Sequence, residues 1–221
     1  MGHTNDQITL YTAQAPAVRE AIRRDGACFS REEYVAEKYQ ESAPIFLTAY
    51  RWFAEHAQAI VPRPAGAQFP YWAFADPCNA DTNGGAVIKL QVPRDQVVLF
   101  DLYDWNKILQ LRYMGEDERQ EKEFRQQLAQ RGLREDQVVL SRFYPQLRQQ
   151  ILDSWDRLFR HHSQLLAGNT EGVGGVQAGL WHTARTRGRC KALGAGRRGQ
   201  SWPRGGSGAR PTGRRWPGRR W

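Results

Sequence analysis

The amino-acid sequence predicts an α+β fold, in which a small mixed or antiparallel sheet of about four to five strands is flanked by helices. Segments with the apolar spacing of helices come early and late in the first 183 residues. Candidate strands cluster in the middle of that region and at its two ends. The chain contains no internal repeat and no regular alternation of strands with helices, so a doubly wound fold is not indicated.

The N-terminal segment predicts one strand followed by two helices. β-Branched and aromatic residues in Ile8–Ala13 favour a strand. Residues 15–27 have helical spacing, with a proline in the first turn and a glycine at the end. A further helix is predicted over residues 30–40, because Ser30 followed by Glu33 matches a capping box, in which each side chain accepts a hydrogen bond from the other residue's backbone.

The most strongly periodic helix is predicted over residues 42–61. Large apolar side chains recur there at helical spacing, at Ile45, Ala49, Trp52, Phe53 and Ile60. Pro44 falls in the first turn, where its missing N–H has no intrahelical partner to lose. Pro62 and Pro64 then end the helix.

Three candidate strands follow this helix. Phe69–Ala75 is rich in aromatic residues, and Ala86–Pro93 is the second candidate. Gln96–Leu102 is almost wholly apolar, which predicts a central strand. Asn83-Gly84 lies between the first two candidates and favours a hairpin turn that joins them.

Two helices are predicted after the strands. Residues 103–114 form the first, with Asp104 as its N-cap. Residues 115–133 form an exposed helix, because acidic residues lead it and a glycine ends it. Glu121 and Arg125 stand four residues apart in this second helix, so we expect them to form an ion pair on its surface.

The last predicted elements are a helix over residues 144–159 and a strand over residues 173–181. The loop GVGGVQ before this strand does not match a dinucleotide-binding loop, because its sixth position is Gln177 and it leads into a strand. His161 and His162 would project about 100° apart on a helix, so they cannot bind one ion together. The pattern indicates a solvated helix end, and no metal site is predicted.

The net charge of +9 arises from the C-terminal end of the chain. Residues 184–221 contain 12 of the 32 Lys and Arg and none of the 23 Asp and Glu, so residues 1–183 have a net charge of −3. We therefore predict a single globular domain over residues 1–183, followed by a disordered tail over residues 184–221. The charge of the domain gives no electrostatic support for nucleic-acid binding.

The tail has two competing interpretations. Gly, Arg, Ala, Pro and Trp make up 30 of its 38 residues, a composition that cannot bury enough apolar surface to fold. It has the arginine and tryptophan of an arm that binds single-stranded nucleic acid. The same residues have codons rich in G and C, so a GC-rich gene translated out of frame would also produce them. The abrupt change in composition near residues 181–184 favours this frameshift.

The sequence also indicates the cellular compartment in which the protein resides. It contains no apolar run long enough to cross a membrane, and its N-terminus lacks the pattern of a secretory signal. Cys28, Cys78 and Cys190 are odd in number and far apart, so neither a disulfide framework nor a zinc site is indicated. These features predict a reduced, cytoplasmic protein. They decide neither catalytic activity nor cofactor nor oligomeric state.

Polar residues at predicted strand ends, placed among aromatic ones, indicate a binding pocket for a small polar or nucleotide-like ligand. Aromatic rings supply stacking surfaces, and isolated amide, hydroxyl and carboxylate groups fix the orientation of a ligand. The pocket is predicted to form from the first strand, the YWAF strand and the end of the apolar strand. Its candidate residues are Tyr11, Thr12, Gln14, Trp72, Asp101 and Gln177.

Several blocks occur in order along the chain and read LYTAQAPAVREAIRRDG, FPYWAFAD, VIKLQVPRDQVVLFDLYDWNKIL, SWDRLF and VQAGLW. Taken together, they resemble a bacterial family of unknown function, domain of unknown function 3841, and the resemblance covers about residues 8–182. The matching positions are Leu10, Tyr11, Thr12, Gln14, Tyr71, Trp72, Phe74, Asp101, Trp105, Ser154, Trp155, Phe159, Val176, Gln177, Ala178 and Trp181. The resemblance implies no activity, but it does imply that the closing strand continues past Trp181.

A second resemblance is architectural. The first strand with LYTAQ, a helix ending in glycine and a later strand VVLFD are similar to small ADP-ribosyltransferase-like domains. That resemblance implies an enzyme that uses NAD. Thr12 or Gln14 would stand where those domains have a His or Arg, with Asp101 as the acid. This transferase and nucleic-acid binding through the tail are the two alternatives to the ligand-binding hypothesis.

Overall fold

A computed structural model of the 221-residue chain describes residues 7–14, 20, 27–80, 86–181 and 183–184. These residues form a five-stranded antiparallel sheet, a two-stranded sheet and a set of helices, so the predicted α+β fold is confirmed. The predicted tail lies outside the described residues, apart from Ala184 at its start. The predicted Asn83-Gly84 turn also lies outside them, as does most of the helix predicted over residues 15–27.

The larger sheet has the strand order β4-β1-β3-β6-β5, and every neighbouring pair is antiparallel. Its strands are β1 (Gln7–Gln14), β3 (Tyr71–Phe74), β4 (Ala86–Pro93), β5 (Val98–Asp101) and β6 (Val176–Leu180). The predicted hairpin between β3 and β4 is wrong, because β1 lies between them. An Asn-Gly pair predicts that the chain reverses direction, but it does not determine which strands then pair. Here β1, from the N-terminal segment, pairs with β4.

The prediction that the apolar strand β5 is central is also wrong, because β5 lies at an edge of the sheet. All four of its residues are nevertheless buried. Helix α8 (His162–Leu166) lies against it, and the backbone N–H of Leu99 donates to Nδ1 of His162 across 3.1 Å. A side chain thus satisfies a backbone donor that an edge strand would otherwise leave exposed.

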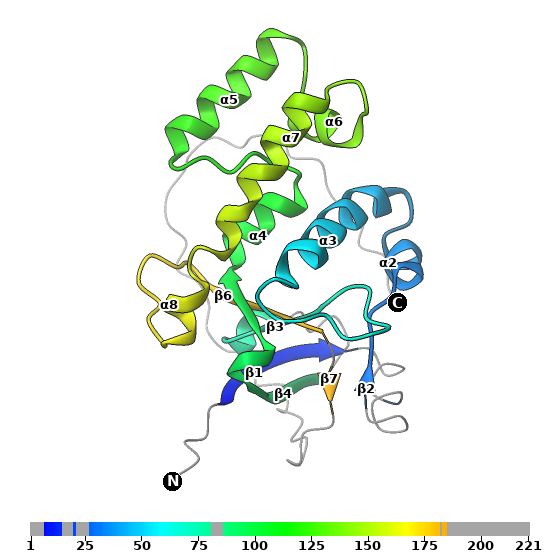
Figure 1. The fold of residues 1–221 in the computed structure, drawn as a ribbon, viewed down its shortest axis with the longest axis vertical. Helices are drawn as coiled ribbons and strands as arrows, with labels where there is room; N and C mark the ends of the chain where they lie inside the picture. The colour runs from blue at the N-terminus through cyan, green and yellow to red at the C-terminus, as the bar shows by residue number, and fades with distance from the viewer. Residues whose placement is uncertain (1–6, 15–19, 21–26, 81–85, 182, 185–221) are drawn as a thin grey trace, which may run out of the picture.

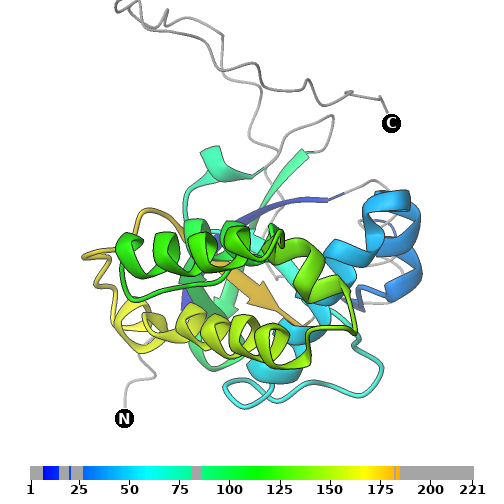
Figure 2. The same ribbon diagram turned by 90° about the horizontal axis from the view of Figure 1, so that it is seen from above.

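The two faces of the larger sheet pack against different sets of side chains. One face carries Trp72 and Phe100, which pack against helix α3 (Ala43–Ala57) and helix α4 (Leu102–Leu109) in a largely aromatic core. The other face carries a second cluster, mostly aliphatic, to which α8 contributes Leu165. Figure 2 looks down onto the helices, which lie over the sheet.

Three more helices extend the fold away from the sheet. Helices α5 (Glu118–Gln130), α6 (Glu135–Leu140) and α7 (Pro145–Ser154) lie at the end of the molecule remote from β1 and β4 (Figure 1). The helix predicted over residues 144–159 divides into α7 and the 3-10 helix η4 (Trp155–Phe159). Helix α6 was not predicted, because its six residues are too few to show a helical period.

The predicted capping box is wrong. Helix α2 (Glu32–Tyr39) begins later than expected, and Ser30 instead forms an isolated β-bridge with Phe69. The backbone N–H of Glu32 donates to Oε1 of Gln68, 2.8 Å away. A residue distant in sequence therefore supplies the cap that the local pattern assigned to Ser30.

Two predictions about acidic residues are also wrong: Asp104 is not an N-cap, and Glu121 is not paired with Arg125. Asp101, rather than Asp104, is the N-cap of α4, and its carboxylate accepts from the backbone N–H of Tyr103 at 2.8 Å. Asp104 is buried and accepts from Arg160 Nη2 at 3.0 Å. Glu121 pairs with Lys107 of α4 at 2.6 Å instead of with a neighbour on its own helix, because that face of α5 is buried.

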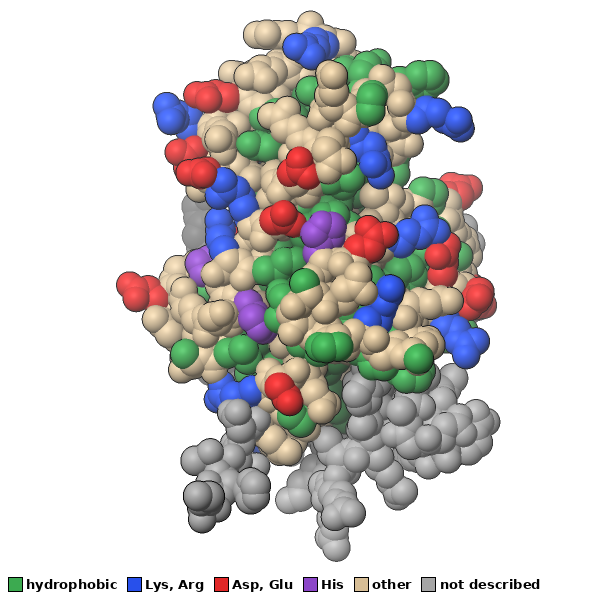
Figure 3. All heavy atoms as spheres, in the orientation of Figure 1, with side chains coloured by type: hydrophobic (Ala, Val, Ile, Leu, Met, Phe, Trp, Pro, Cys, Tyr) green, Lys and Arg blue, Asp and Glu red, His purple; other side chains and the backbone are tan. Residues whose placement is uncertain are grey.

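The histidine pair at the predicted solvated helix end is half-buried and bonded. Arg160 Nε donates to Nε2 of His161 at 3.0 Å, and His162 supports β5 as described above. Charged side chains of both signs are interspersed with hydrophobic ones on the face shown in Figure 3. Among the described residues, every helix is too short or too polar to span a lipid bilayer.

A two-stranded sheet, β2 (Ala27–Cys28) with β7 (Thr183–Ala184), was not predicted. Each strand has only two residues, too few for a periodic pattern. β6 ends at Leu180, and β7 pairs with β2 in the other sheet, so the continuation of the closing strand past Trp181 that the family resemblance implied is not seen in β6. β7 ends at Ala184, which is where the composition of the chain changes.

Candidate functional site

The candidate site lies where two neighbouring strands of the larger sheet diverge. β1 pairs with β4 along its whole length, but its register with β3 holds a single Cα pair, Tyr11 with Phe74. Beyond this pair the hydroxyl of Thr12 donates to the carbonyl of Trp72 at 2.8 Å, and Nε2 of Gln14 donates to Oγ1 of Thr12 at 2.8 Å. Side chains thus replace the missing backbone ladder, and a gap opens between the strands.

We call this gap the strand pocket. It has a volume of about 300 Å³ and is lined by residues at the carboxyl end of β1 and on α2. Figure 1 shows that β1 runs toward the side of the molecule on which α2 lies. Strands β1 and β3, the segment before each of α2 and β3, and helices α2 and α3 contribute its lining. The lining residues are Thr12, Ala13, Gln14, Ser30, Tyr34, Val35, Lys38, Tyr39, Tyr50, Pro70, Tyr71, Trp72 and Phe74.

Aromatic rings form most of the walls of the strand pocket. The ring of Tyr50 meets that of Trp72 edge-on, with centroids 5.2 Å apart, and Trp72 is held in turn by Phe53 and Trp105 at 5.0 and 4.6 Å. Because these rings belong to the core, the wall is rigid. Burial raises the pKa of the Tyr50 phenol far above its usual value, and the neighbouring Tyr39 raises it further, so this hydroxyl stays protonated and can donate.

The strand pocket has one formally charged lining residue, Lys38. Its ammonium lies 5.1 Å from the centroid of the Tyr39 ring, a cation–π distance, and the side chain is exposed. Lys38 has no carboxylate partner within the described part of the chain. The pocket therefore combines aromatic walls, a neutral polar pair from β1 and one positive charge at its rim.

The sequence profile of the family described as Domain of unknown function (DUF3841) matches residues 9–187. The chain belongs to this family. The match covers the strand pocket and, apart from Gln7 and Ile8 of β1, both sheets, and it ends beyond the boundary at residue 183 that the composition predicted. The chain has no significant match among curated proteins or among solved structures.

Three of the six predicted site residues line the strand pocket of this DUF3841 domain: Thr12, Gln14 and Trp72. Tyr11 does not line it, although it is paired with Phe74, which does. Asp101 lies at the opposite end of the sheet, because the antiparallel register places it with Val176 while Gln14 aligns with Ala86. Two strands also separate β1 from β5, so the structure does not bring Asp101 to Thr12 and Gln14.

Asp101 of the DUF3841 domain has a structural role at its own end of the sheet. Besides capping α4, its carboxylate accepts from the backbone N–H of Gly174 at 3.0 Å, which ties the loop before β6 to β5. Gln177 lies beside it in the next strand, paired across the sheet with Phe74 and Phe100. Its side-chain oxygen is buried and has no hydrogen-bond partner among the described residues. Such a group usually bonds an internal water.

Sequence reasoning missed the helical half of the strand pocket in this DUF3841 domain. Tyr34 and Lys38 stand four residues apart on α2 and so share one face of the helix, and Tyr39 and Tyr50 complete that wall. The i,i+4 spacing of Tyr34 and Lys38 was visible in the sequence. Nothing local showed that this face of α2 would line the same pocket as β1. The described residues hold no group of three or more His, Cys, Asp or Glu side chains suited to a metal ion.

Proposed function

We propose that this DUF3841 domain binds a small, planar, anionic ligand of the nucleotide class in the strand pocket. The observation that carries the proposal is the combination of aromatic walls with a single lysine at the rim. A pocket that attracts one negative charge and offers stacking surfaces favours a ligand with both features. The volume of about 300 Å³ lies at the lower end of the range for small-molecule sites, which suits one base and its sugar better than a dinucleotide.

Each part of the pocket has a role in this proposal. The base packs against the aromatic wall that includes Trp72, while the hydroxyl of Tyr50 and the amide oxygen of Gln14 face its polar edges. Gln14 is held by its bond to Thr12, so the amide is already oriented before a ligand arrives. Lys38 meets the phosphate at the rim, where its exposed ammonium is free to turn toward it.

Binding is tested by isothermal titration of the full chain with AMP, GMP, CMP, UMP, their nucleosides and NAD. We expect at least one monophosphate to bind, and to bind more tightly than its nucleoside, because Lys38 contacts the phosphate. Lys38→Gln should lower the affinity for the monophosphate by roughly tenfold, which corresponds to the loss of one charge-assisted hydrogen bond. Gln14→Ala should lower the affinity for the monophosphate and for its nucleoside by the same factor.

Matched controls lie far from the strand pocket. Lys122→Gln removes an exposed lysine on α5, and Phe143→Ala removes a side chain that is 82% exposed. Neither change should alter affinity. The proposal fails if no nucleotide binds at millimolar concentration, or if Lys38→Gln behaves like Lys122→Gln. Tighter binding of NAD than of any monophosphate would favour the transferase alternative instead.

A further inference from the structure

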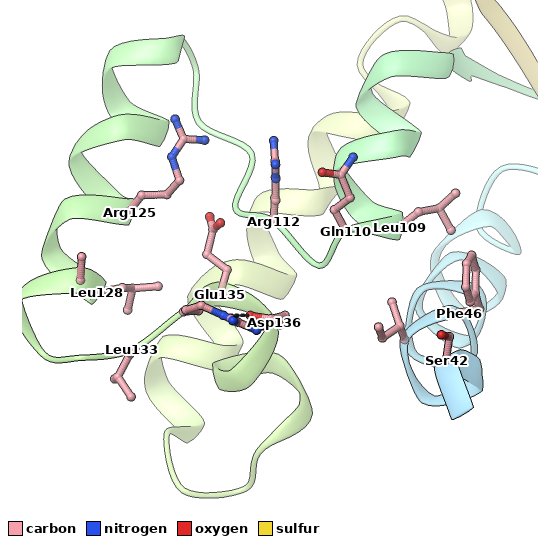
Figure 4. Close-up of a pocket in the computed structure, with 13 residues that line it drawn as sticks. Ser42, Phe46, Leu109, Gln110, Arg112, Arg125, Leu128, Leu133, Glu135 and Asp136 are labelled. Carbon is pink, nitrogen blue, oxygen red and sulfur yellow. Dashed lines mark hydrogen bonds and ion pairs between the residues drawn. The ribbon is translucent and has the colours of Figure 1, made fainter. Parts of the chain in front are cut away.

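A second pocket lies among the helices, and we call it the helix pocket. It has a volume of about 520 Å³ and is formed by the start of α3, the end of α4 with the segment after it, α5, and the segment leading into α6 (Figure 4). It is separate from the strand pocket. The wall between the two is a stacked ring pair, Tyr39 of the strand pocket on Phe46 of the helix pocket, with centroids 3.6 Å apart.

The floor of the helix pocket is apolar. Ile45, Phe46, Leu109 and Leu133 are partly buried side chains that pack on the main core and still face the pocket, and Leu128 is buried behind them. An apolar surface left half-covered in this way gains free energy when an apolar ligand removes it from water. The body of a ligand that fits here is therefore apolar.

The rim of the helix pocket is charged, with an excess of positive charge. Arg134 and Asp136 neutralise each other through two hydrogen bonds of 3.0 and 2.6 Å. Of the remaining charges, Arg112 and Arg125 outnumber the single carboxylate of Glu135. Figure 4 shows both guanidinium groups and this carboxylate directed toward the same side of the pocket.

Burial raises the pKa of the Glu135 carboxyl, and Arg112 and Arg125 lie close enough for their charges to lower it in part, but Glu135 forms an ion pair with neither arginine. Its carboxylate accepts from the backbone N–H of Tyr113 at 3.0 Å, which holds it at the junction of α6 with the segment after α4. Within the described part of the chain, neither Arg112 nor Arg125 forms an ion pair with it or with another carboxylate. Two guanidinium groups with ten N–H donors between them therefore face a single carboxylate, one oxygen of which already accepts from Tyr113.

From this geometry we infer that the helix pocket is a second ligand site, which takes a small amphipathic molecule with an apolar body and one carboxylate group. The body lies over Phe46 and Leu128, and the carboxylate meets Arg112 and Arg125. Guanidinium recognises a carboxylate through paired, parallel hydrogen bonds, which gives the site its preference for an acid over a neutral head group. The inference is independent of the nucleotide proposed for the strand pocket.

The test is isothermal titration of the full chain with octanoate, and with 1-octanol as the neutral molecule of the same length. Octanoate should bind with a stoichiometry of one and at least about tenfold more tightly than octanol, since a charge-assisted pair replaces a neutral one. Arg112→Gln and Arg125→Gln should each lower the affinity for octanoate by roughly tenfold and leave the affinity for octanol unchanged. Ala129→Trp should abolish the binding of both, because its indole fills the pocket without removing a charge.

Arg119→Gln on α5 is the matched control, since Arg119 is exposed on the same helix but does not line the pocket. It should bind octanoate like the unchanged chain, and so should Gln14→Ala in the strand pocket. Far-ultraviolet circular dichroism of each variant establishes that it is folded. The inference is overturned if octanoate does not bind at millimolar concentration, if octanol binds equally well, or if Arg112→Gln and Arg125→Gln match Arg119→Gln.

Discussion

Gly179 of β6 should not tolerate even one added methyl group. A Cβ built at this position lies 2.6 Å from Cζ of Phe53 and 2.9 Å from Cε1, roughly 1 Å inside the normal contact distance between carbon atoms. The Phe53 ring is 1% exposed, and it has aromatic neighbours on several sides, with Trp72, Phe100 and Trp105 at 5.0, 5.4 and 5.4 Å. It therefore has no free space to move into.

Gly179→Ala should consequently destabilise the fold by about 1–3 kcal/mol, the usual cost of overpacking a core. In a chain of this size, each kcal/mol lowers the melting temperature by about 2–4 °C. Urea unfolding followed by tryptophan fluorescence measures the change in free energy. The double variant Gly179→Ala with Phe53→Leu should be more stable than the sum of the two single changes predicts, by about 0.5 kcal/mol or more, because the smaller side chain relieves the overlap.

Gly175→Ala, at the residue just before β6, is the matched control. Its added Cβ lies 3.4 Å from Cβ and 3.5 Å from Cδ2 of Leu102, which are ordinary contact distances. This variant should be as stable as the unchanged chain within about 0.5 kcal/mol. Equal stability of Gly179→Ala and Gly175→Ala would refute the reasoning, because it would mean that Phe53 does not lie against β6 as the structure has it.

Two further predictions concern groups outside the strand and helix pockets. Burial lowers the pKa of His162, and Leu99 donates to its Nδ1, so the neutral ring is the form that stabilises the fold. Its contribution is complete above the unfolded pKa of about 6.5 and is lost as the pH falls toward the lower folded value. His162→Asn keeps an acceptor but cannot titrate, so the difference in urea stability between pH 7.5 and pH 5 should shrink. Asp101→Ala removes the acceptor for Tyr103 and Gly174 and should cost about 1–3 kcal/mol, measured in the same way, whereas an equally stable variant would contradict the capping role.

The local patterns of the sequence were reliable where one element determines its own structure. Pro44 in the first turn of α3 and the bounds of β4 are as predicted, since helical spacing and strand composition are properties of short segments. The family was also identified from the order of local blocks. Of the candidate site, the sequence located the two polar residues of β1 and Trp72 of β3, because polar groups among aromatic residues stand out in any sequence.

The errors share a physical cause, which is that a distant partner displaced a local one. Gln68 caps α2 in place of Ser30, Lys107 takes Glu121 away from Arg125, and α8 buries an edge strand that looked central. Each local interaction is worth only a few tenths of a kcal/mol to about 1 kcal/mol, so a contact that also buries surface outweighs it. The same holds for Asp101, which the strand order places on β5, with β3 and β6 between it and Gln14 of β1.

The sequence by itself determined the α+β class, the family and the periodic helices and strands, because these depend on residue type and spacing within a segment. Only the tertiary structure decided which strands are neighbours, and so where β1 and β3 part and which helix faces cover the opening. Strand order depends on contacts between residues far apart in the chain, whose free energy no local pattern records. For that reason Tyr34 and Lys38 became part of a pocket only when the fold brought α2 and β1 to line the same opening.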